Sequence, residues 1–169
     1  KADKGCILNS RILWFFSNAY LTLGDKECLA YAGHAWKFLK DCFYDSEDGG
    51  VFWSVSYDGK PSDDTKHTYN QAFAVYGLAS YYGASGEKEA LSLAYSLADK
   101  METRCRDEGG YLEAFDRHFQ PASNEKLSEN GVMAGRTMNT LLHVLEAYTE
   151  LYRVDKNECI GDKIKQMLR

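Results

Sequence analysis

Three polar side chains recur along one face of an otherwise apolar segment, "TMNTLLHVLEAYTELYR", residues 137–153. Asn139, His143 and Glu146 are spaced by four and three residues, which aligns side chains on one face of an α-helix. An imidazole can transfer a proton and an amide can hold hydroxyl groups, so this stripe suits acid–base chemistry on a polar small molecule. A metal site is the weaker interpretation, because no second His or Cys cluster completes the H-x-x-E pair. We therefore predict neither a metal nor a cofactor.

A second candidate is the arginine of "NSRILWFF". Arg11 is surrounded in sequence by apolar residues, and a cation in such a setting normally has an anion or an oxygen as its partner. The segment "KHTYNQAF" adds Lys66, His67 and Tyr69 at the start of another apolar block, where packing at the helix start is the competing explanation. Arg11 and Tyr69 are therefore candidate ligand-binding residues.

Two turn-rich segments supply an aromatic ring and several charges. Trp53 lies in "GGVFWSV", and Glu113, Asp116 and Arg117 lie in "GGYLEAFDR". A tryptophan beside carboxylates suits sugar binding, since the apolar face of a pyranose stacks on an aromatic ring. The alternative for the second segment is an ion pair that orders a hairpin, and both interpretations stay open.

These candidates fall on a sequence that repeats itself about every sixty residues. The blocks "RILWFFSNAY", "AFAVYGLASY" and "NTLLHVLEAY" end on Tyr20, Tyr81 and Tyr148, and we predict one domain, residues 1–169, of three units over about 6–60, 66–121 and 132–169. Each unit reads as a helical hairpin. The first helix is apolar nearly all round, which predicts burial on both sides, and the second helix is amphipathic, which predicts an outer layer. Gly24 and Gly86 mark the turns between the helices, and the Gly-Gly segments indicate short β-hairpin insertions.

The predicted fold is therefore all-α: an α/α toroid whose inner helices line a central pocket, amounting to about half of a closed ring. In the register of the three blocks, Arg11 corresponds to Ala72 and Asn139, and Phe15 corresponds to Tyr76 and His143. This register predicts that Arg11 and Asn139 meet at one level of the pocket, with His143 one turn deeper.

Composition argues against several classes of function. The 169 residues carry a net charge of −5 with scattered Lys and Arg, which argues against nucleic acid as a partner. No apolar run is long enough to span a membrane. Five cysteines without C-x-x-C spacing favour neither disulfides nor zinc, so we expect a cytoplasmic protein. The N-terminus has neither an initiator Met nor a signal-peptide pattern, and the C-terminus ends inside an amphipathic segment without a helix cap. We therefore expect the chain to be part of a longer protein.

The ordered blocks "NSRILWFFSNAY", "KHTYNQAFAVYGLASYY", "GGYLEAFDRHF" and "MNTLLHVLEAYTELYR" resemble the N-acylglucosamine 2-epimerase superfamily and, within it, the cellobiose 2-epimerases. The resemblance runs along essentially the whole chain. It implies the first half of an (α/α)6 barrel and epimerisation at C2 of the reducing-end sugar of a β-1,4-linked disaccharide, through ring opening and an enediolate. It also implies two proton-transferring histidines beyond residue 169.

The resemblance assigns roles to four residues. Arg11 would stabilise the enediolate oxygens, His143 would support the reacting end, and Asn139 and Tyr69 would contact the sugar. Gly131 and Phe119 depart from the family pattern, in which many relatives carry an aspartate and a tryptophan that bear on the distal sugar.

Other functions remain open at this point. An aldose–ketose isomerase, an N-acylglucosamine 2-epimerase or a glycoside hydrolase could use the same toroid, and hydrolysis would need Glu113 and Asp116 as its carboxylate pair. A non-catalytic carbohydrate-binding domain is a further alternative. We expect a small-molecule sugar as the ligand. We also expect the isolated chain to be inactive, because it offers one wall of the pocket, and to self-associate through uncovered repeat faces.

Overall fold

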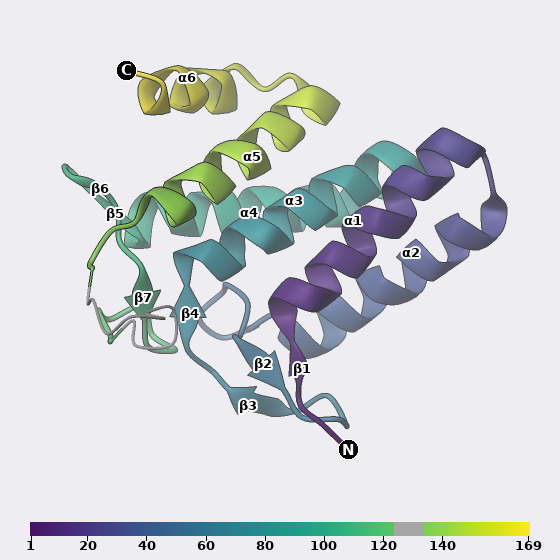
Figure 1. Ribbon diagram of the computed structural model, residues 1–169, viewed down its shortest axis with the longest axis horizontal. Coiled ribbons are helices and arrows are strands. Elements are labelled where there is room, and N and C mark those ends of the chain that lie inside the picture. Colours follow the sequence, from purple (N-terminus) through teal and green to yellow (C-terminus); the bar gives the residue numbers. More distant parts are fainter. Residues whose placement is uncertain (124–133) are drawn as a thin grey trace.

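Six helices form two layers in the computed structural model, which describes residues 1–123 and 134–169 (Figure 1). The inner layer consists of three helices of 18 residues each: α1 (Cys6–Leu23), α3 (Thr68–Ser85) and α5 (Met138–Asp155). The outer layer consists of α2 (Lys26–Phe38), which continues into a π-helical turn (Leu39–Phe43), α4 (Lys88–Arg104) and α6 (Glu158–Met167). The three predicted helical hairpins are therefore confirmed.

The turn inside each hairpin has the same geometry. Gly24, Gly86 and Lys156 adopt left-handed conformations with φ of 70°, 74° and 55°, and each amide donates a hydrogen bond to the carbonyl four residues earlier. Glycine tolerates this conformation without strain, which explains the first two turns. In the third unit a lysine adopts it instead.

The inner helices differ in burial. Twelve residues of α3 are buried because α3 packs against α1 on one side and against α5 on the other. On α1 only four are buried, and Leu8, Phe15 and Leu23 remain 61%, 57% and 72% exposed. The expectation that every inner helix is buried on both sides is thus wrong for α1 and α5, each of which has one inner neighbour in the described part of the chain.

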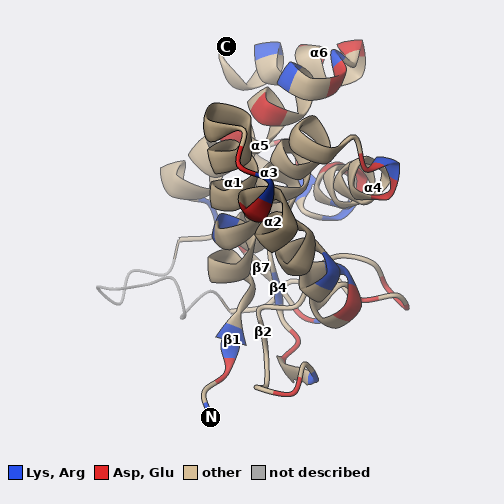
Figure 2. Ribbon diagram, turned by 90° about the vertical axis from the view of Figure 1, so that its right-hand side faces the viewer, with Lys and Arg blue, Asp and Glu red and all other residues tan. Residues whose placement is uncertain are grey.

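Acidic and basic residues lie on the outer helices, as Figure 2 shows for α4 and α6. Between the layers, Trp36, Leu78, Leu97 and Tyr148 belong to one apolar core that joins all three hairpins. Among residues 1–123 and 134–169, no helix has both the length and the apolar character needed to cross a lipid bilayer.

Short strands gather near the N-terminal ends of the inner helices (Figure 1). The strands β1 (Lys4–Gly5), β2 (Ser54–Val55) and β3 (Pro61–Asp63) form one antiparallel sheet, β5 (Arg106–Asp107) pairs with β6 (Gly110–Tyr111), and β4 (Lys66–His67) pairs with β7 (Ala114–Phe115). A hairpin with Asp58 and Gly59 in its turn joins β2 and β3, which confirms the β-hairpin predicted in the first Gly-Gly segment. The second Gly-Gly segment also folds back on itself, with an antiparallel bridge between Phe115 and Pro121, a few residues later than the sequence pattern predicts. In addition, β7 pairs with β4 from the preceding unit.

An ion network joins these segments; it is buried at Lys66 and Asp45 and exposed at Glu47. Lys66 Nζ lies 2.8 Å from Asp45 Oδ2 and donates to the Gly49 carbonyl at 2.6 Å. Arg117 Nε also reaches Asp45, at 3.1 Å, and its NH2 reaches Glu47 at 2.6 Å. Burial alone would raise the pKa of Asp45, but the bonds from Arg117 and Lys66 outweigh it and hold that pKa well below its usual range. Arg117 thus orders the second Gly-Gly segment by pairing with the first.

Candidate active site

Three side chains, one from each inner helix, lie at the same level of the inner wall, which is the surface formed by α1, α3 and α5. Arg11, Phe73 and His143 are each the sixth residue of their helix. The Arg11 guanidinium carbon lies 4.7 Å from the centre of the Phe73 ring, and that ring lies 4.6 Å from the imidazole of His143. A cation and a titratable ring therefore flank one aromatic side chain.

This arrangement corrects the predicted register. Arg11 corresponds to Phe73 and His143, whereas the sequence blocks aligned it with Ala72 and Asn139. The tyrosine at which the blocks were aligned is displaced by one residue in the second unit and by four in the third. Arg11 and His143 are consequently level with each other, and Asn139 lies one turn nearer the N-terminal rim.

The guanidinium of Arg11 is open to a ligand. The side chain is exposed on the inner wall, and no carboxylate of residues 1–123 or 134–169 lies within ion-pairing distance of it. Its recorded contact is the face of Phe73, which leaves the N–H donors available. A fixed, permanently charged group of this kind suits an oxygen that develops negative charge.

The imidazole of His143 is held on several sides. Its Nδ1 lies 2.7 Å from Oε2 of Glu146, and its ring centre lies 4.8 Å from that of Tyr69, edge to face. With Phe73 on another side, the side chain is 17% exposed. The ring is thus partly buried and fixed in orientation, yet it remains within reach of a small molecule.

Two further predicted residues lie at the rim of the inner wall, which is formed by the N-terminal ends of the inner helices. Tyr69 and Asn139 are the second residues of α3 and α5, one turn before Phe73 and His143. Tyr69 is half-buried against the ring of His143, and Asn139 is exposed. Helical spacing puts Asn139 on the same face as His143, so its amide and the imidazole project toward the same side.

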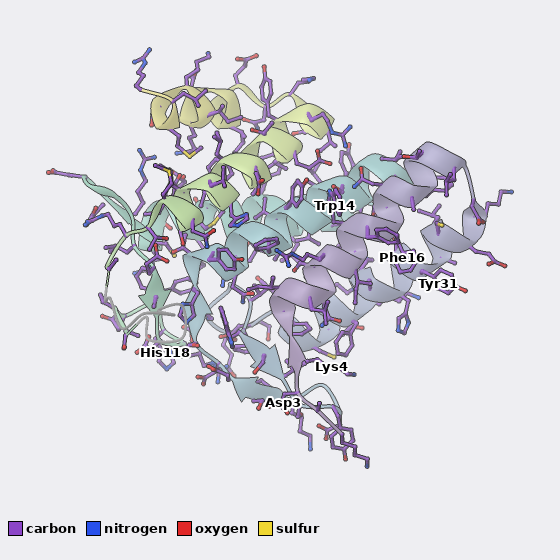
Figure 3. All side chains as sticks on the ribbon, in the orientation of Figure 1. Asp3, Lys4, Trp14, Phe16, Tyr31 and His118 are labelled. Atoms are coloured by element: carbon purple, nitrogen blue, oxygen red, sulfur yellow. The ribbon has the colours of Figure 1, made fainter. Side chains whose placement is uncertain are left out.

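Below the Arg11 level, the ninth residues of the inner helices form another row: Trp14, Tyr76 and Glu146. Trp14 and Tyr76 stack with ring centres 5.6 Å apart, and the view of the side chains shows Trp14 at the boundary between α1 and α3 (Figure 3). Burial raises the pKa of Tyr76, and Glu150 and Glu146 add to this effect. A hollow of about 290 Å³ lies beside Tyr76, Glu146 and Glu150.

Sequence reasoning missed Phe73 and Trp14, and it put Tyr76 level with His143, whereas the structure puts it level with Glu146. The signal that could have found them is position within each helix. Counted from the left-handed turn residues Gly24 and Gly86, the first two helices align so that the sixth and ninth residues coincide.

Trp53 lies outside this row, on the segment before β2. Its ring centre is 4.6 Å from that of His67, and its amide and carbonyl bond to Thr65 and Cys6. The ring thus packs at the start of α3, two residues before Tyr69. The structure brings together Arg11, Tyr69 and His143, with Asn139 beside them, and leaves Trp53 at the periphery.

Glu113 has a different role from the one expected. Its side chain is 2% exposed, its Oε1 accepts from the Thr137 amide at 2.7 Å, and its Oε2 accepts from the Thr140 hydroxyl at 2.7 Å. It therefore caps the start of α5. The expectation that Glu113 binds sugar directly is wrong, because both oxygens are buried and occupied. For the same reason Glu113 and Asp116 do not form the carboxylate pair that hydrolysis requires.

The two departures from the family pattern have separate outcomes. Phe119 is 7% exposed, and its ring packs over the Lys66 ammonium at 4.7 Å, so it is not available to a distal sugar. Gly131 lies outside the described residues. Among residues 1–123 and 134–169, no three His, Cys, Asp or Glu side chains gather in a way that would hold a metal ion.

Comparison with known proteins agrees with the resemblance seen in the sequence. The family model of N-acylglucosamine 2-epimerase (GlcNAc 2-epimerase) matches residues 1–165. A cellobiose 2-epimerase of Ruminococcus albus is 58% identical over 168 residues, covering 99% of this chain and 43% of that protein. A cellobiose 2-epimerase of Eubacterium cellulosolvens is 62% identical over 150 residues, covering 89% of this chain and 37% of that protein.

The solved structures agree on the fold. The crystal structure of a sugar epimerase from a ruminal bacterium superimposes with a TM-score of 0.97 at 57% identity, over 99% of this chain and 43% of that one. The chain thus forms about half of an (α/α)6 barrel, and it spans less than half the length of the relatives that it matches.

Proposed function

Because this chain belongs to the N-acylglucosamine 2-epimerase family, we propose that the full-length protein epimerises the reducing-end sugar of β-1,4-linked disaccharides such as cellobiose at C2. The reaction interconverts glucose and mannose at that position. Support comes from relatives named cellobiose 2-epimerase at 58% and 62% identity and from the composition of the inner wall. The setting we propose is the cytoplasm, in keeping with five free thiols.

Epimerisation at C2 requires a group that stabilises negative charge on the sugar oxygens. After ring opening, a base removes the proton at C2, and the electron pair of that C–H bond moves toward the C1 aldehyde to give an enediolate. A proton then returns to C2 from the opposite face, which inverts the configuration without net oxidation. The oxygens at C1 and C2 carry negative charge between these two steps, so the transition state gains most from a fixed cation beside them.

The proposal rests on one observation: Arg11, Phe73 and His143 lie at the same level of the inner wall. Arg11 offers unpaired N–H donors to the enediolate oxygens, and His143 presents an oriented ring 4.6 Å from the same phenyl group. Asn139 and Tyr69 would hold sugar hydroxyls at the rim. Trp53 would stack on the sugar nearer the solvent.

Arg11 gives the direct test. In the full-length protein with cellobiose in D2O, we expect glucosyl-mannose to form with deuterium at C2, followed by NMR. Arg11→Ala should lower kcat/KM by about 100- to 1000-fold, the usual effect of losing a donor to a developing oxyanion. Arg104→Ala, which removes an exposed arginine from the outer helix α4, is the matched control and should leave the rate unchanged.

The products separate the alternatives. A ketose product would identify an aldose–ketose isomerase, which passes through the same enediolate, and conversion of an N-acylated sugar alone would identify an N-acylglucosamine 2-epimerase. Sugar binding without C2 exchange would leave a carbohydrate-binding domain and reject the proposal.

A further inference from the structure

We propose that Glu146 is a positioning residue that selects the tautomer of His143 and so presents Nε2 of that ring to the substrate. The proposal deepens the function above and rests on it for its kinetic consequence, although the tautomer itself can be measured without any activity. The sequence singled out Glu146 as a member of the polar stripe and as half of a weak metal motif, without a role of its own. Among the described side chains, its hydrogen-bond partner is the histidine.

In the hydrogen bond between His143 and Glu146, the chemistry of the two groups determines which atom donates. Nδ1 of His143 lies 2.7 Å from Oε2 of Glu146. An ionised carboxylate has no proton to donate, so the proton in this bond belongs to Nδ1. In the neutral ring Nε2 then carries the lone pair. That nitrogen can accept a hydrogen bond from a sugar hydroxyl or take up a proton.

The packing around the ring keeps this assignment fixed. Tyr69 meets the imidazole at an interplanar angle of 80° and Phe73 meets it at 42°, so two rings from α3 restrict rotation about the side-chain bonds. The carboxylate and the ring lie three residues apart on α5, a spacing at which the two side chains meet without bending the helix. The rings of Tyr69 and Phe73 therefore fix the orientation of the imidazole, whereas Glu146 fixes its tautomer.

The charges around the ring single out Glu146 as the partner. From α1, Arg11 lies across Phe73. From α3, Tyr69 contacts the ring, and Tyr76 lies at the level of Glu146. On α5, Glu150 lies one turn beyond Glu146.

Glu150 is engaged elsewhere. Its Oε1 accepts from the Ser80 hydroxyl and from Arg153 NH2, both at 2.7 Å, and its Oε2 accepts from Arg153 Nε at 2.7 Å. Glu150 therefore has the same charge, helix and face as Glu146 but no bond to the imidazole, which makes it a matched control.

The experiment combines ring spectroscopy with kinetics on the full-length protein. The ¹⁵N shifts of the His143 ring, assigned by their loss in His143→Ala, should show Nδ1 protonated and Nε2 unprotonated above the pH at which the ring loses its charge. In Glu146→Ala the preference for Nδ1–H should be lost. We also expect kcat/KM on cellobiose to fall by about 10- to 100-fold, the equivalent of one hydrogen bond to a charged group.

Two further variants test whether the bond itself matters. Glu146→Gln keeps an oxygen that can accept from Nδ1–H, so it should retain most of the tautomer preference and rescue part of the rate. Glu150→Gln should change neither the ¹⁵N shifts nor the rate. Melting temperatures of all three variants show whether a loss reflects unfolding. If Glu146→Ala does not fold, Glu146→Met, which keeps the length of the side chain but has no carboxylate to accept from Nδ1–H, replaces it and should show the same loss of tautomer preference.

An Nε2–H tautomer in the wild type, or an unchanged tautomer in Glu146→Ala, would overturn the inference. If the wild type shows no C2 exchange, the proposed function fails, but the ring spectra still decide the role of Glu146.

Discussion

The buried pair of Lys66 and Asp45 should dominate the stability of the loops that carry the rim. Their side chains are 0% and 2% exposed, and the ammonium also donates to the Gly49 carbonyl. Lys66→Met keeps the aliphatic bulk but removes the charge, which leaves Asp45 buried with Arg117 as its remaining cationic partner. Breaking a buried pair on one side typically costs about 3–5 kcal/mol, and because Arg117 stays, we expect about 3 kcal/mol.

Urea unfolding at pH 7 measures this loss. The control is Lys60→Met, since the Lys60–Asp58 pair is 81% and 41% exposed, and such surface pairs contribute about 0–1 kcal/mol. Removing both charges, in Lys66→Met with Asp45→Asn, should recover part of the loss because no lone buried charge remains. A loss below about 1 kcal/mol in Lys66→Met, or one equal to that of Lys60→Met, would refute the reasoning.

The pH dependence follows from the same residues. The folded-state pKa of Asp45 is lowered, so its contribution is fully present above its ordinary pKa of 3.8 and is lost as the pH falls through the folded value. The wild type should therefore lose stability below about pH 4, and Asp45→Asn should show a weaker dependence there.

Other predictions address the caps, the turns and the isolated chain. Glu113→Ala leaves the donors at the start of α5 unpaired and should lower the free energy of unfolding by about 1–3 kcal/mol, measured by urea titration. Gly50→Ala should destabilise more than Gly86→Ala by thermal unfolding: both have positive φ, but only at Gly50 would the new methyl group lie 2.7 Å from Phe119. The 169-residue chain alone should show no C2 exchange, and light scattering should detect self-association through the exposed apolar faces of α1 and α5.

The helices and their turns could be predicted from the sequence because both depend on local physics. Apolar periodicity marks the inner and outer helices, and Gly24 and Gly86 supply the left-handed conformation that ends two of the inner ones. The register could not be predicted, because Lys156 adopts that conformation without any local signal for it, and Tyr81 and Tyr82 offer two adjacent anchors.

The contacts that organise the site are long-range, which is why sequence spacing did not reveal them. Glu113 reaches Thr137 and Thr140 over 24 and 27 residues, and Lys66 reaches Asp45 over 21. Such pairs depend on how the hairpins pack. By contrast, the convergence of Arg11, Asn139 and His143 on one surface was predicted, since residues near the starts of neighbouring inner helices converge if those helices line one pocket. Their relative levels were not predicted.

The common sixth position makes the inner wall tolerant of some length changes and intolerant of others. Insertions in the segments between hairpins leave each helix start where it is, so units whose helices begin 62 and 70 residues apart still present their side chains at one height. Deleting a single residue between Cys6 and Arg11 would instead rotate the guanidinium by about 100° around the helix axis and turn it away from Phe73. Over evolution, the linkers can drift in length while the first two turns of each inner helix cannot.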